Sequence, residues 1–257
     1  MKKLLVLMFS VFMLLALVGC GGQEKKAEKA PAKVLRVATD ANYPPFEYYQ
    51  SRTAVHTGYD VDLMNALGKA MGYDKVEFSN VAFGSIDNVL ASKKADVAIA
   101  GITINEERKA KMAFSDPYIK DGLKIIVDIK GNMGDDAKAL AGKKVAVEKS
   151  STAWEFVKKN GQAKEIIALD DNETVIKAVH AGVADCAVMS QLVGKYYITN
   201  GFGKDVKFAG EAKLDEEVYG IALAKDNKEL QAKLNKALAD YKKTPDHKKL
   251  VVTYFGK

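Results

Sequence analysis

The sequence predicts an α/β protein with two lobes. Short apolar runs alternate with helical patterns from Val34 onward, and the alternation starts again after Leu123. Strands and helices that take turns at this spacing are typical of βαβ units, in which helices join parallel strands. A chain of 257 residues, 48% of them hydrophobic, can bury the core of one large or two modest domains.

Composition and charge exclude several classes of protein. Lys and Arg exceed Asp and Glu by 39 to 33, a formal charge of +6, but six lysines and two glutamates fall before residue 34. The remaining chain is therefore close to neutral, with acids and bases interspersed, and lacks the basic stripe that binds nucleic acid. The hydrophobic content excludes a disordered chain or a collagen-like repeat.

The first 19 residues are typical of an export signal. Lys2 and Lys3 precede an apolar run over 4–18, which at about 15 residues is shorter than the roughly 20 of a transmembrane helix. The end of this run, Leu-Val-Gly-Cys at 17–20, resembles the lipobox of bacterial lipoproteins and implies a lipid on Cys20. An ordinary cleavage site with an incidental cysteine is the alternative. Residues 20–33, polar and without periodicity, are expected to form a flexible tether.

The other cysteine and the histidines give no sign of a metal site. Cys186 lies in an apolar stretch, where a thiol acts as a small core residue. His56, His180 and His247 are far apart in the chain and lack the spacing of metal ligands. We therefore expect neither a metal nor a cofactor and, if Cys20 carries lipid, no intramolecular disulfide.

The expected elements follow in order along the chain. In the first block we expect strands at 34–38, 76–78 and 97–100, with helices at 61–71 and 86–92. In the second block we expect strands at 145–147, 166–169 and 187–189, with helices at 154–159 and 175–181. The last helices are expected at 228–242 and 245–254. Helix starts are indicated by Asn105 before two glutamates, and by Thr152 three residues before Glu155, as in a capping box.

Two extended runs, 122–129 and 219–224, fall between the blocks and are predicted to cross from one lobe to the other. They divide the chain into a first lobe over 34–122, an inserted second lobe over 123–217, and a return to the first lobe over 218–257. Ligands of open α/β sheets bind at the carboxyl ends of the strands. We therefore expect the site in the cleft between the lobes.

Polar and aromatic residues gather where the predicted strands end. Asp40 and Tyr43 follow the strand at 34–38, before two prolines that stop the strand and stiffen the turn. They are followed by Gly58-Tyr59-Asp60-Val61-Asp62-Leu63, by Phe83, by the stretch from Ala100 to Arg108, and by Phe114-Ser115-Asp116-Pro117-Tyr118. This series resembles the extracellular solute-binding proteins of polar amino acid ABC transporters, and the resemblance covers 34–257. It implies the type II periplasmic binding fold, with two open, mostly parallel sheets joined by two crossover strands.

The resemblance implies an amino acid ligand, and both of its charges must be met when it leaves water. Arg108 offers a planar fork to the carboxylate, and Gly101 and Thr103 offer backbone and hydroxyl donors. Ser151 and Thr152 open a helix of the second lobe, whose free N–H groups attract anions. By resemblance, the carboxylate is held by Arg108, Gly101, Thr103 and Thr152, and Ala100 lines the same site.

Each of these residues also has an ordinary structural interpretation. Arg108 can pair on the surface with a glutamate of its own helix, and Ser151 or Thr152 can act as a simple helix cap. Tyr43 and Phe83 match the aromatic pair that sandwiches the ligand side chain in the family, or they can be core aromatics.

The sequence departs from the family at Ser190. Family members usually carry an aspartate there, which pairs with the ligand ammonium, and the loss of this charge costs roughly 1 to 3 kcal/mol. Glu148, at the end of the strand at 145–147, is the nearest candidate to compensate. A solvated charge beside Lys149 is the alternative interpretation of Glu148.

Asp40 and Glu148 would place one negative group on each side of the ligand, which favours a basic or otherwise polar amino acid over an acidic one. We expect a monomer that is anchored by lipid to the outer face of the cell membrane or lies in the periplasm, and that delivers its ligand to a permease. The second hypothesis is an enzyme similar to cyclohexadienyl dehydratases, with Glu148 as a general acid. A ligand-binding sensory module is the third.

Overall fold

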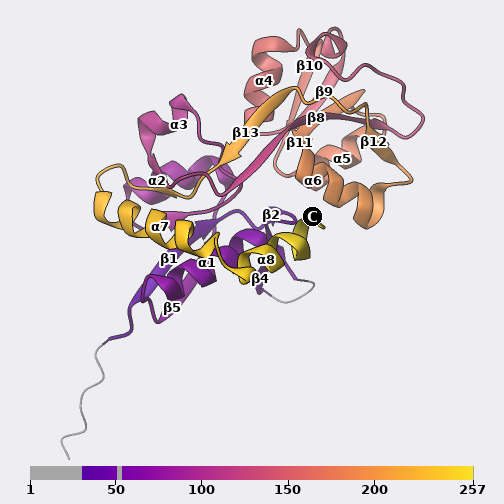
Figure 1. Cartoon of the computed structure of the whole chain (residues 1–257). Coiled ribbons are helices and arrows are strands. Elements are labelled where there is room, and N and C mark those ends of the chain that lie inside the picture. Colours follow the sequence, from indigo (N-terminus) through magenta and orange to yellow (C-terminus); the bar gives the residue numbers. More distant parts are fainter. Residues whose placement is uncertain (1–30, 51–53, 257) are drawn as a thin grey trace, which may run out of the picture. The chain divides into compact units, whose positions relative to one another are not determined.

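The computed structural model describes residues 31–50 and 54–256, and Figure 1 traces their helices and strands. The predicted export signal at 1–19, the predicted lipid on Cys20 and the predicted tether up to residue 30 lie outside the described residues. Within the described ranges, no helix combines the length and the apolar composition that crossing a membrane requires.

The first sheet has the strand order β5-β1-β6-β14-β7. β1 pairs in parallel with β5 and β6, whereas β14 comes from the end of the chain and runs antiparallel to β6 and β7. Leu35 and Val37 on β1 are fully buried because helices cover the sheet. The strands are β1 (Val34–Thr39), β5 (Lys75–Asn80), β6 (Val97–Ala98), β7 (Ala113–Phe114) and β14 (Ala222–Leu223).

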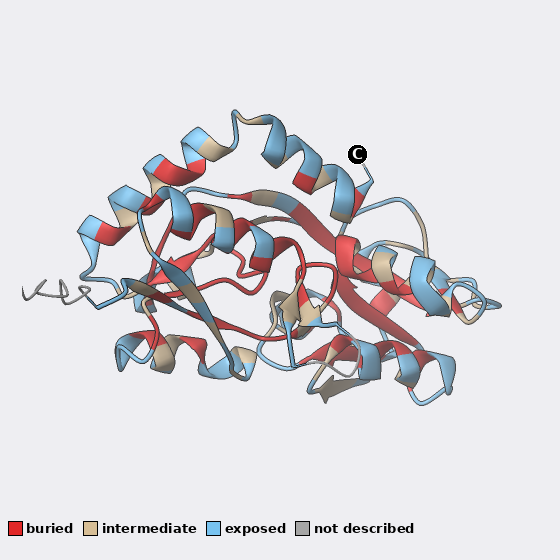
Figure 2. Ribbon diagram, turned by 90° about the horizontal axis from the view of Figure 1, so that it is seen from below, coloured by how far each residue is buried: buried red, intermediate tan, exposed pale blue. Residues whose placement is uncertain are grey.

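Helices and a small second sheet enclose this first sheet. α1 buries Leu63, Met64 and Leu67 on one face and packs against α7 and α8. Figure 2 shows buried residues concentrated on the strands and on one face of the helices. The elements are α1 (Tyr59–Ala70), α2 (Ile86–Ala91), α3 (Glu106–Lys111), α7 (Lys228–Tyr241), α8 (Pro245–Phe255), the 3₁₀ turn η1 (Phe83–Ser85), and the small sheet of β2 (Asn42–Tyr43), β3 (Glu47–Tyr49) and β4 (His56–Thr57).

The sheet of the second lobe has the order β10-β9-β11-β8-β12, with β13 paired along β8. Its strands are β8 (Ile119–Asp128), β9 (Lys144–Glu148), β10 (Glu165–Leu169), β11 (Cys186–Ser190), β12 (Val206–Phe208) and β13 (Asp215–Tyr219). Cys186 is buried on β11, as expected of a core residue. The helices are α4 (Thr152–Asn160), α5 (Asn172–His180), α6 (Gln191–Tyr197), with the short turns η2 (Ala137–Leu140) and η3 (Ile198–Phe202).

Two antiparallel strands, β8 and β13, connect the lobes, and we call them the connecting strands (Figure 1). Their register runs from Asp215 opposite Leu123 to Tyr219 opposite Ile119. The predicted lobe boundaries, at 122/123 and 217/218, fall within these two strands. The second crossing is β13, which lies earlier in the chain than the predicted run at 219–224. It was not predicted because the exposed acidic residues on one face of β13 mask the strand pattern, although its other face is buried. Ala222 and Leu223 already belong to the first sheet.

The α/β prediction is confirmed, and both sheets are mixed where mostly parallel sheets were expected. β1, β5 and β6 are parallel, as are β9, β10 and β11. Antiparallel pairs arise where the chain leaves or re-enters a lobe, because β8, β13 and β14 run against the strands beside them. The parallel strands still end at one edge of each sheet, which is where the predicted site residues lie.

Gly58 fixes the start of α1 against the loop that carries Phe46, and its replacement tests this packing. Its φ is +126°, and a Cβ there would lie 2.2 Å from the Phe46 carbonyl oxygen. We predict that Gly58→Ala lowers the free energy of unfolding by roughly 3 kcal/mol, since strain and a backbone clash act together. Gly72→Ala is the matched control: φ is +79°, nothing lies within 4 Å, and we expect a loss of roughly 1 kcal/mol. Equal losses in urea denaturation would contradict the packing argument.

Candidate functional site

One small cavity collects the residues that the sequence analysis identified. All of the predicted ligand residues except Ser190 line it. The first lobe contributes the ends of β1 and β6, and the second lobe contributes the end of β9 and the start of α4. We call it the central cavity, and its lining residues are Asp40, Asn42, Tyr43, Glu47, Phe83, Ala100, Gly101, Thr103, Arg108, Glu148, Ser151 and Thr152.

Asp40 stands at the end of β1 and lines the central cavity. It is 7% exposed, and its Oδ2 accepts the backbone N–H of Phe83 at 2.8 Å, which ties η1 to β1. Burial raises the pKa of Asp40 to about 6, and repulsion from Asp171 of the second lobe adds to the rise. A cation beside Asp40 would relieve both effects.

The backbone N–H of Gly101, predicted as a donor to the ligand, is already engaged within the first lobe. It donates to Asp60 Oδ2 at 3.2 Å, and the Tyr118 hydroxyl donates to the same oxygen at 2.8 Å. Gly101 itself is needed here, because φ is +52° and a Cβ would lie 2.5 Å from Tyr43 Cε1. The Thr103 hydroxyl is engaged as well, because it donates to Glu217 Oε1 at 3.0 Å, so Arg108 is the main first-lobe donor for a carboxylate.

Glu47 and Asp60 form a buried carboxyl pair beside this loop, which the sequence analysis did not assign to the site. Both residues are fully buried, and the Glu47 oxygens have no partner among the described residues if both groups are ionised. Burial, and then the nearby Asp60, raise the pKa of Glu47 well above its usual range. Glu47 therefore keeps its proton and donates a hydrogen bond to Asp60, whose pKa burial raises to about 6.

Arg108 reaches from α3 across to the second lobe. Asn105 caps α3, as predicted, since its Oδ1 accepts the Arg108 N–H at 2.9 Å. The guanidinium donates to the Thr103 carbonyl at 3.2 Å and to the Ser150 carbonyl at 3.4 Å, and lies 5.1 Å from the centre of the Phe83 ring. Two of the five guanidinium N–H donors are used in this way, and among the described residues the others have no hydrogen-bond acceptor.

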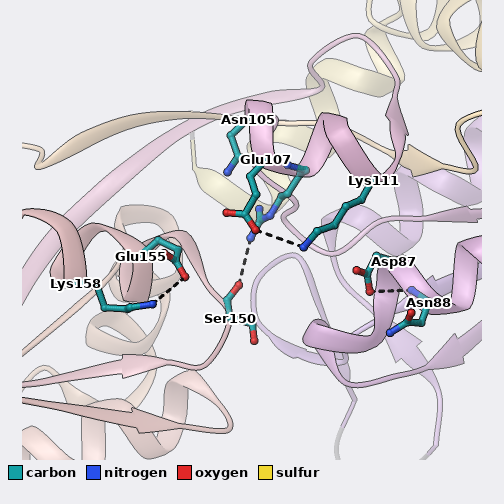
Figure 3. A network of polar contacts seen from close by, with 9 residues as sticks. Asp87, Asn88, Asn105, Glu107, Lys111, Ser150, Glu155 and Lys158 are labelled. Atoms are coloured by element: carbon teal, nitrogen blue, oxygen red, sulfur yellow. Dashed lines mark hydrogen bonds and ion pairs between the residues drawn. The ribbon is translucent and has the colours of Figure 1, made fainter.

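The structure does not support the alternative interpretation of Arg108, in which it pairs on the surface with a glutamate of its own helix. Glu106 pairs with Lys109 at 2.8 Å, and Glu107 pairs with Lys111 at 3.4 Å. Figure 3 shows the Glu107–Lys111 pair on α3, with Ser150 opposite it on the second lobe. These side chains border a wider outer pocket of about 270 Å³, which adjoins the central cavity at Arg108.

Tyr43 and Phe83 differ in how they are packed. The Tyr43 ring stacks on Phe46 with 5.6 Å between centroids, and its hydroxyl lies 3.2 Å from that of Tyr219. Tyr43 is therefore both a core residue and a wall of the cavity. Phe83 is half-buried, and its ring lies beside the Arg108 guanidinium.

Glu148 closes the central cavity from the second lobe. It ends β9 and is 7% exposed, and Asn172 Nδ2 donates to its Oε2 at 2.8 Å. It is not a solvated partner of Lys149, which pairs with Asp170 instead. Burial raises the pKa of Glu148 to about 8, and repulsion from Asp40 contributes.

Ser151, rather than Thr152, caps α4. Its Oγ accepts the Trp154 N–H at 3.1 Å and donates to the Glu148 carbonyl at 2.7 Å. The helix therefore begins at Thr152, two residues before the predicted start, and the expected capping box with Glu155 is replaced by the serine cap. The Thr152 side chain instead hydrogen-bonds Glu217 on β13.

Ser190 lies beside the central cavity and not in it. Its hydroxyl caps α6 by accepting the Val193 N–H at 3.1 Å, and it donates to the Asp121 carboxylate. Ser190 lines a second small space, here called the inner cavity, together with Tyr43, Glu148, Thr152, Asn172 and Glu217 among others. The two cavities share Tyr43, Glu148, Ser151 and Thr152.

Two buried acids on the connecting strands were not identified from the sequence: Asp121 on β8 and Glu217 on β13. The Thr103 hydroxyl donates to Glu217 Oε1 at 3.0 Å, and the Tyr219 hydroxyl donates to Asp121 Oδ2 at 2.9 Å. The signal that could have found Glu217 is the two-residue period of a strand over 215–219, which places Glu217 and Tyr219 on the same face. That signal is informative only once 215–219 is known to be a strand.

The central cavity is too small for an amino acid in this conformation. It holds about 20 Å³ of space, room for roughly one water molecule, whereas ligand pockets begin near roughly 300 Å³. The bond from Arg108 to the Ser150 carbonyl joins the two lobes across its edge. Entry of a ligand therefore requires the lobes or the lining side chains to move apart.

The arrangement suits a small molecule that carries both signs of charge. Arg108 can meet an anionic group, and Asp40 and Glu148 can meet a cationic group. In the described part of the chain, no cluster of three or more His, Cys, Asp and Glu side chains has the geometry of a metal site.

Known proteins resemble the chain over most of its length. The model of the bacterial extracellular solute-binding proteins, family 3, matches residues 35–257. A probable histidine-binding protein of Neisseria gonorrhoeae is 34% identical over 95% of this chain and 92% of its own length. An arginine-binding extracellular protein of Bacillus subtilis is 31% identical over 99% of this chain and 98% of its own. An ancestral arginine-binding protein bound to arginine superposes with a TM-score of 0.81 at 37% identity, covering 87% of this chain and 98% of its own.

The raised pKa of Glu148 predicts how stability depends on pH. The unfolded chain holds a glutamate near pKa ~4.3, so between that value and about 8 the folded protein binds more protons than the unfolded one. We predict that the free energy of unfolding, without ligand, falls as pH rises from 5 to 8, and that Glu148→Gln makes this fall smaller. The fall that remains comes from Glu47, Asp40 and Asp60, whose pKa values burial also raises.

Urea denaturation at several pH values in that range measures the effect. Glu165→Gln, on an exposed position of the neighbouring strand β10, is the control and should keep the wild-type pH profile. A Glu148→Gln profile parallel to the wild type would contradict the assigned environment of Glu148.

Proposed function

Since the chain belongs to family 3 of the bacterial extracellular solute-binding proteins, we propose that it captures an amino acid with a cationic side chain in the central cavity and delivers it to an ABC transporter permease. Arginine, lysine, ornithine and histidine are the ligands of this class. The proposal depends on one observation above the others, namely the two buried carboxyl groups that face the cavity from opposite lobes.

Asp40 and Glu148 are the two groups in question. Both are 7% exposed, burial raises the pKa of each, and repulsion from Asp40 adds to the rise at Glu148. A buried pair of like charges is costly, and a cation between them turns the repulsion into two attractions. An acidic ligand side chain would increase the repulsion, and an apolar one would leave it unrelieved.

The opposite end of the cavity suits the ligand carboxylate. Arg108 supplies a charged fork, and the N-terminus of α4 adds a favourable dipole. The hydroxyls of Thr103 and Thr152 border this end and are hydrogen-bonded to Glu217. Tyr43 and Phe83 border the space between the two ends, where the aliphatic part of the side chain would lie. Relatives that are named for histidine or arginine binding support a ligand with a cationic side chain.

Export and attachment form part of the same proposal. The extracellular and periplasmic relatives support export of this chain. We propose that Cys20 carries a lipid, that residues 20–33 tether the lobes to the outer face of a membrane, and that the protein works as a monomer. Mass spectrometry of the membrane-bound protein tests the lipid, because Cys20→Ser should abolish both the added mass and the membrane attachment.

One observation favours a second candidate function. The pKa of about 8 keeps Glu148 protonated at neutral pH, as a general acid requires. A dehydratase similar to cyclohexadienyl dehydratase would use that proton on a carboxylate substrate without a cationic side chain. Binding without turnover of arginine or lysine favours the transport function, and failure of all 20 amino acids to bind favours the enzyme.

The charge argument predicts that arginine binds more tightly as pH rises. Cation binding needs the ionised forms of Asp40 and Glu148, whose pKa values are about 6 and about 8. We expect the affinity to increase between pH 6 and 9, by up to about tenfold per pH unit, and to level off above the pKa of Glu148. Calorimetry should show that Glu148→Gln removes the increase above pH 7. A flat wild-type profile would exclude the proposed role of these two groups.

The anchoring role of Arg108 gives another prediction. Arg108→Ala should weaken arginine binding by about 2 kcal/mol or more, because it leaves the ligand carboxylate unpaired. Arg108→Lys should bind nearly as poorly, since a point charge replaces a fork. Lys109→Ala is the matched control, because Lys109 is exposed and pairs with Glu106 in its own helix. Wild-type affinity in Arg108→Ala would show that the carboxylate binds elsewhere.

A further inference from the structure

The connecting strands place two carboxylates directly opposite each other. Glu217 on β13 faces Asp121 on β8 across the antiparallel pair. The two residues are 4% and 3% exposed. Like charges at directly opposed positions of a sheet destabilise it, so this pair needs compensation from hydrogen bonds or from a cation.

Hydrogen bonds compensate Asp121 more completely than Glu217. Asp121 accepts the hydroxyls of Ser190 and Tyr219 and the Leu192 N–H. The Tyr219 hydroxyl lies 2.9 Å from Asp121 but 3.5 Å from Glu217, so its proton is directed mainly at Asp121. Glu217 is left with the hydroxyls of two threonines and the attraction of Arg108.

Glu217 adjoins the end of the cavity where the ligand carboxylate is proposed to bind. Its two threonine partners are Thr103 and Thr152, which line the central cavity with Arg108. Glu217 itself lines the inner cavity together with Ser190. In an amino acid the ammonium and carboxylate groups share one carbon atom, so a partner for the ammonium must lie in this immediate neighbourhood.

Glu148, the other candidate to bind the ligand ammonium, lies among different charged groups. One of its oxygens is bonded to Asn172, and the charges that act on it are those of Asp40, Asp171 and Arg108. The charges that act on Glu217 are those of Asp121 and Arg108. The cleft thus contains two acidic centres, Asp40 with Glu148 and Asp121 with Glu217, and a cationic amino acid carries two cationic groups.

We propose that Glu217, supported by Asp121 across the strand pair, binds the α-ammonium of the ligand in place of an acidic residue at position 190. This inference rests on the proposed function, since it requires an amino acid in the cleft. Glu217 would then be the residue that distinguishes an amino acid from the same molecule without its amino group.

Calorimetry of purified protein with L-arginine and with 5-guanidinopentanoic acid, which is arginine without its α-amino group, tests the proposal. In Glu217→Gln we expect arginine to bind at least tenfold more weakly, while 5-guanidinopentanoic acid binds as tightly as to the wild type or more tightly. Glu216→Gln is the matched control: it is the next residue of β13, exposed and paired with Lys213, and should leave both affinities unchanged.

The other outcomes separate the two claims. Equal weakening of both ligands in Glu217→Gln, unchanged arginine affinity, or tighter binding of both ligands would overturn the role of Glu217. Failure of the wild type to bind any cationic amino acid would instead overturn the proposed function. Should Glu217→Gln not fold, as judged by circular dichroism, Glu217→Asp replaces it. Because this substitution withdraws the carboxylate by one methylene, we again expect a loss of affinity that is confined to arginine.

Discussion

Burial of carboxyl groups around a space between two lobes is the constraint on which the site depends. Asp40 comes from one sheet, Glu148 from the other and Glu217 from the strand that joins them, and each is less than a tenth exposed. Arg108 is the cationic side chain that lines the same space. An excess of buried negative charge is unfavourable in the protein alone, and a cationic ligand makes it favourable. Under the proposed function, the electrostatic energy that folding leaves unrelieved would be the source of affinity and of selectivity.

The connecting strands link this charge to the motion that the small central cavity requires. Asp121, Glu217 and Tyr219 lie on the two strands about which the lobes would have to move. A ligand that contacts Glu217 would therefore touch the hinge region itself, whereas contacts with Asp40 and Glu148 would draw the lobes together from either side. Ligand binding and closure would then share the same contacts, so that a ligand of the wrong charge fails to stabilise the closed form.

Strand ends could be located from the sequence, because prolines and helix caps mark where apolar runs stop, and Asp40 and Glu148 were placed in this way. Arg108, which lies in helix α3, was assigned through the family resemblance. The sequence could not show how backbone groups are used. The Gly101 N–H is occupied by Asp60, and the Ser190 hydroxyl is occupied by Asp121, because residues distant in the chain meet there. Glu217 was missed because its strand is marked by exposed acids, and its proposed role follows from the register that sets it opposite Asp121.

A crystal structure of the protein with L-arginine tests the central claim most directly. The account predicts that the guanidinium lies between the carboxylates of Asp40 and Glu148, within hydrogen-bonding distance of both, and that the ligand carboxylate lies on Arg108. Arginine bound in the outer pocket, or in the reverse orientation with its guanidinium away from Asp40 and Glu148, would contradict the account.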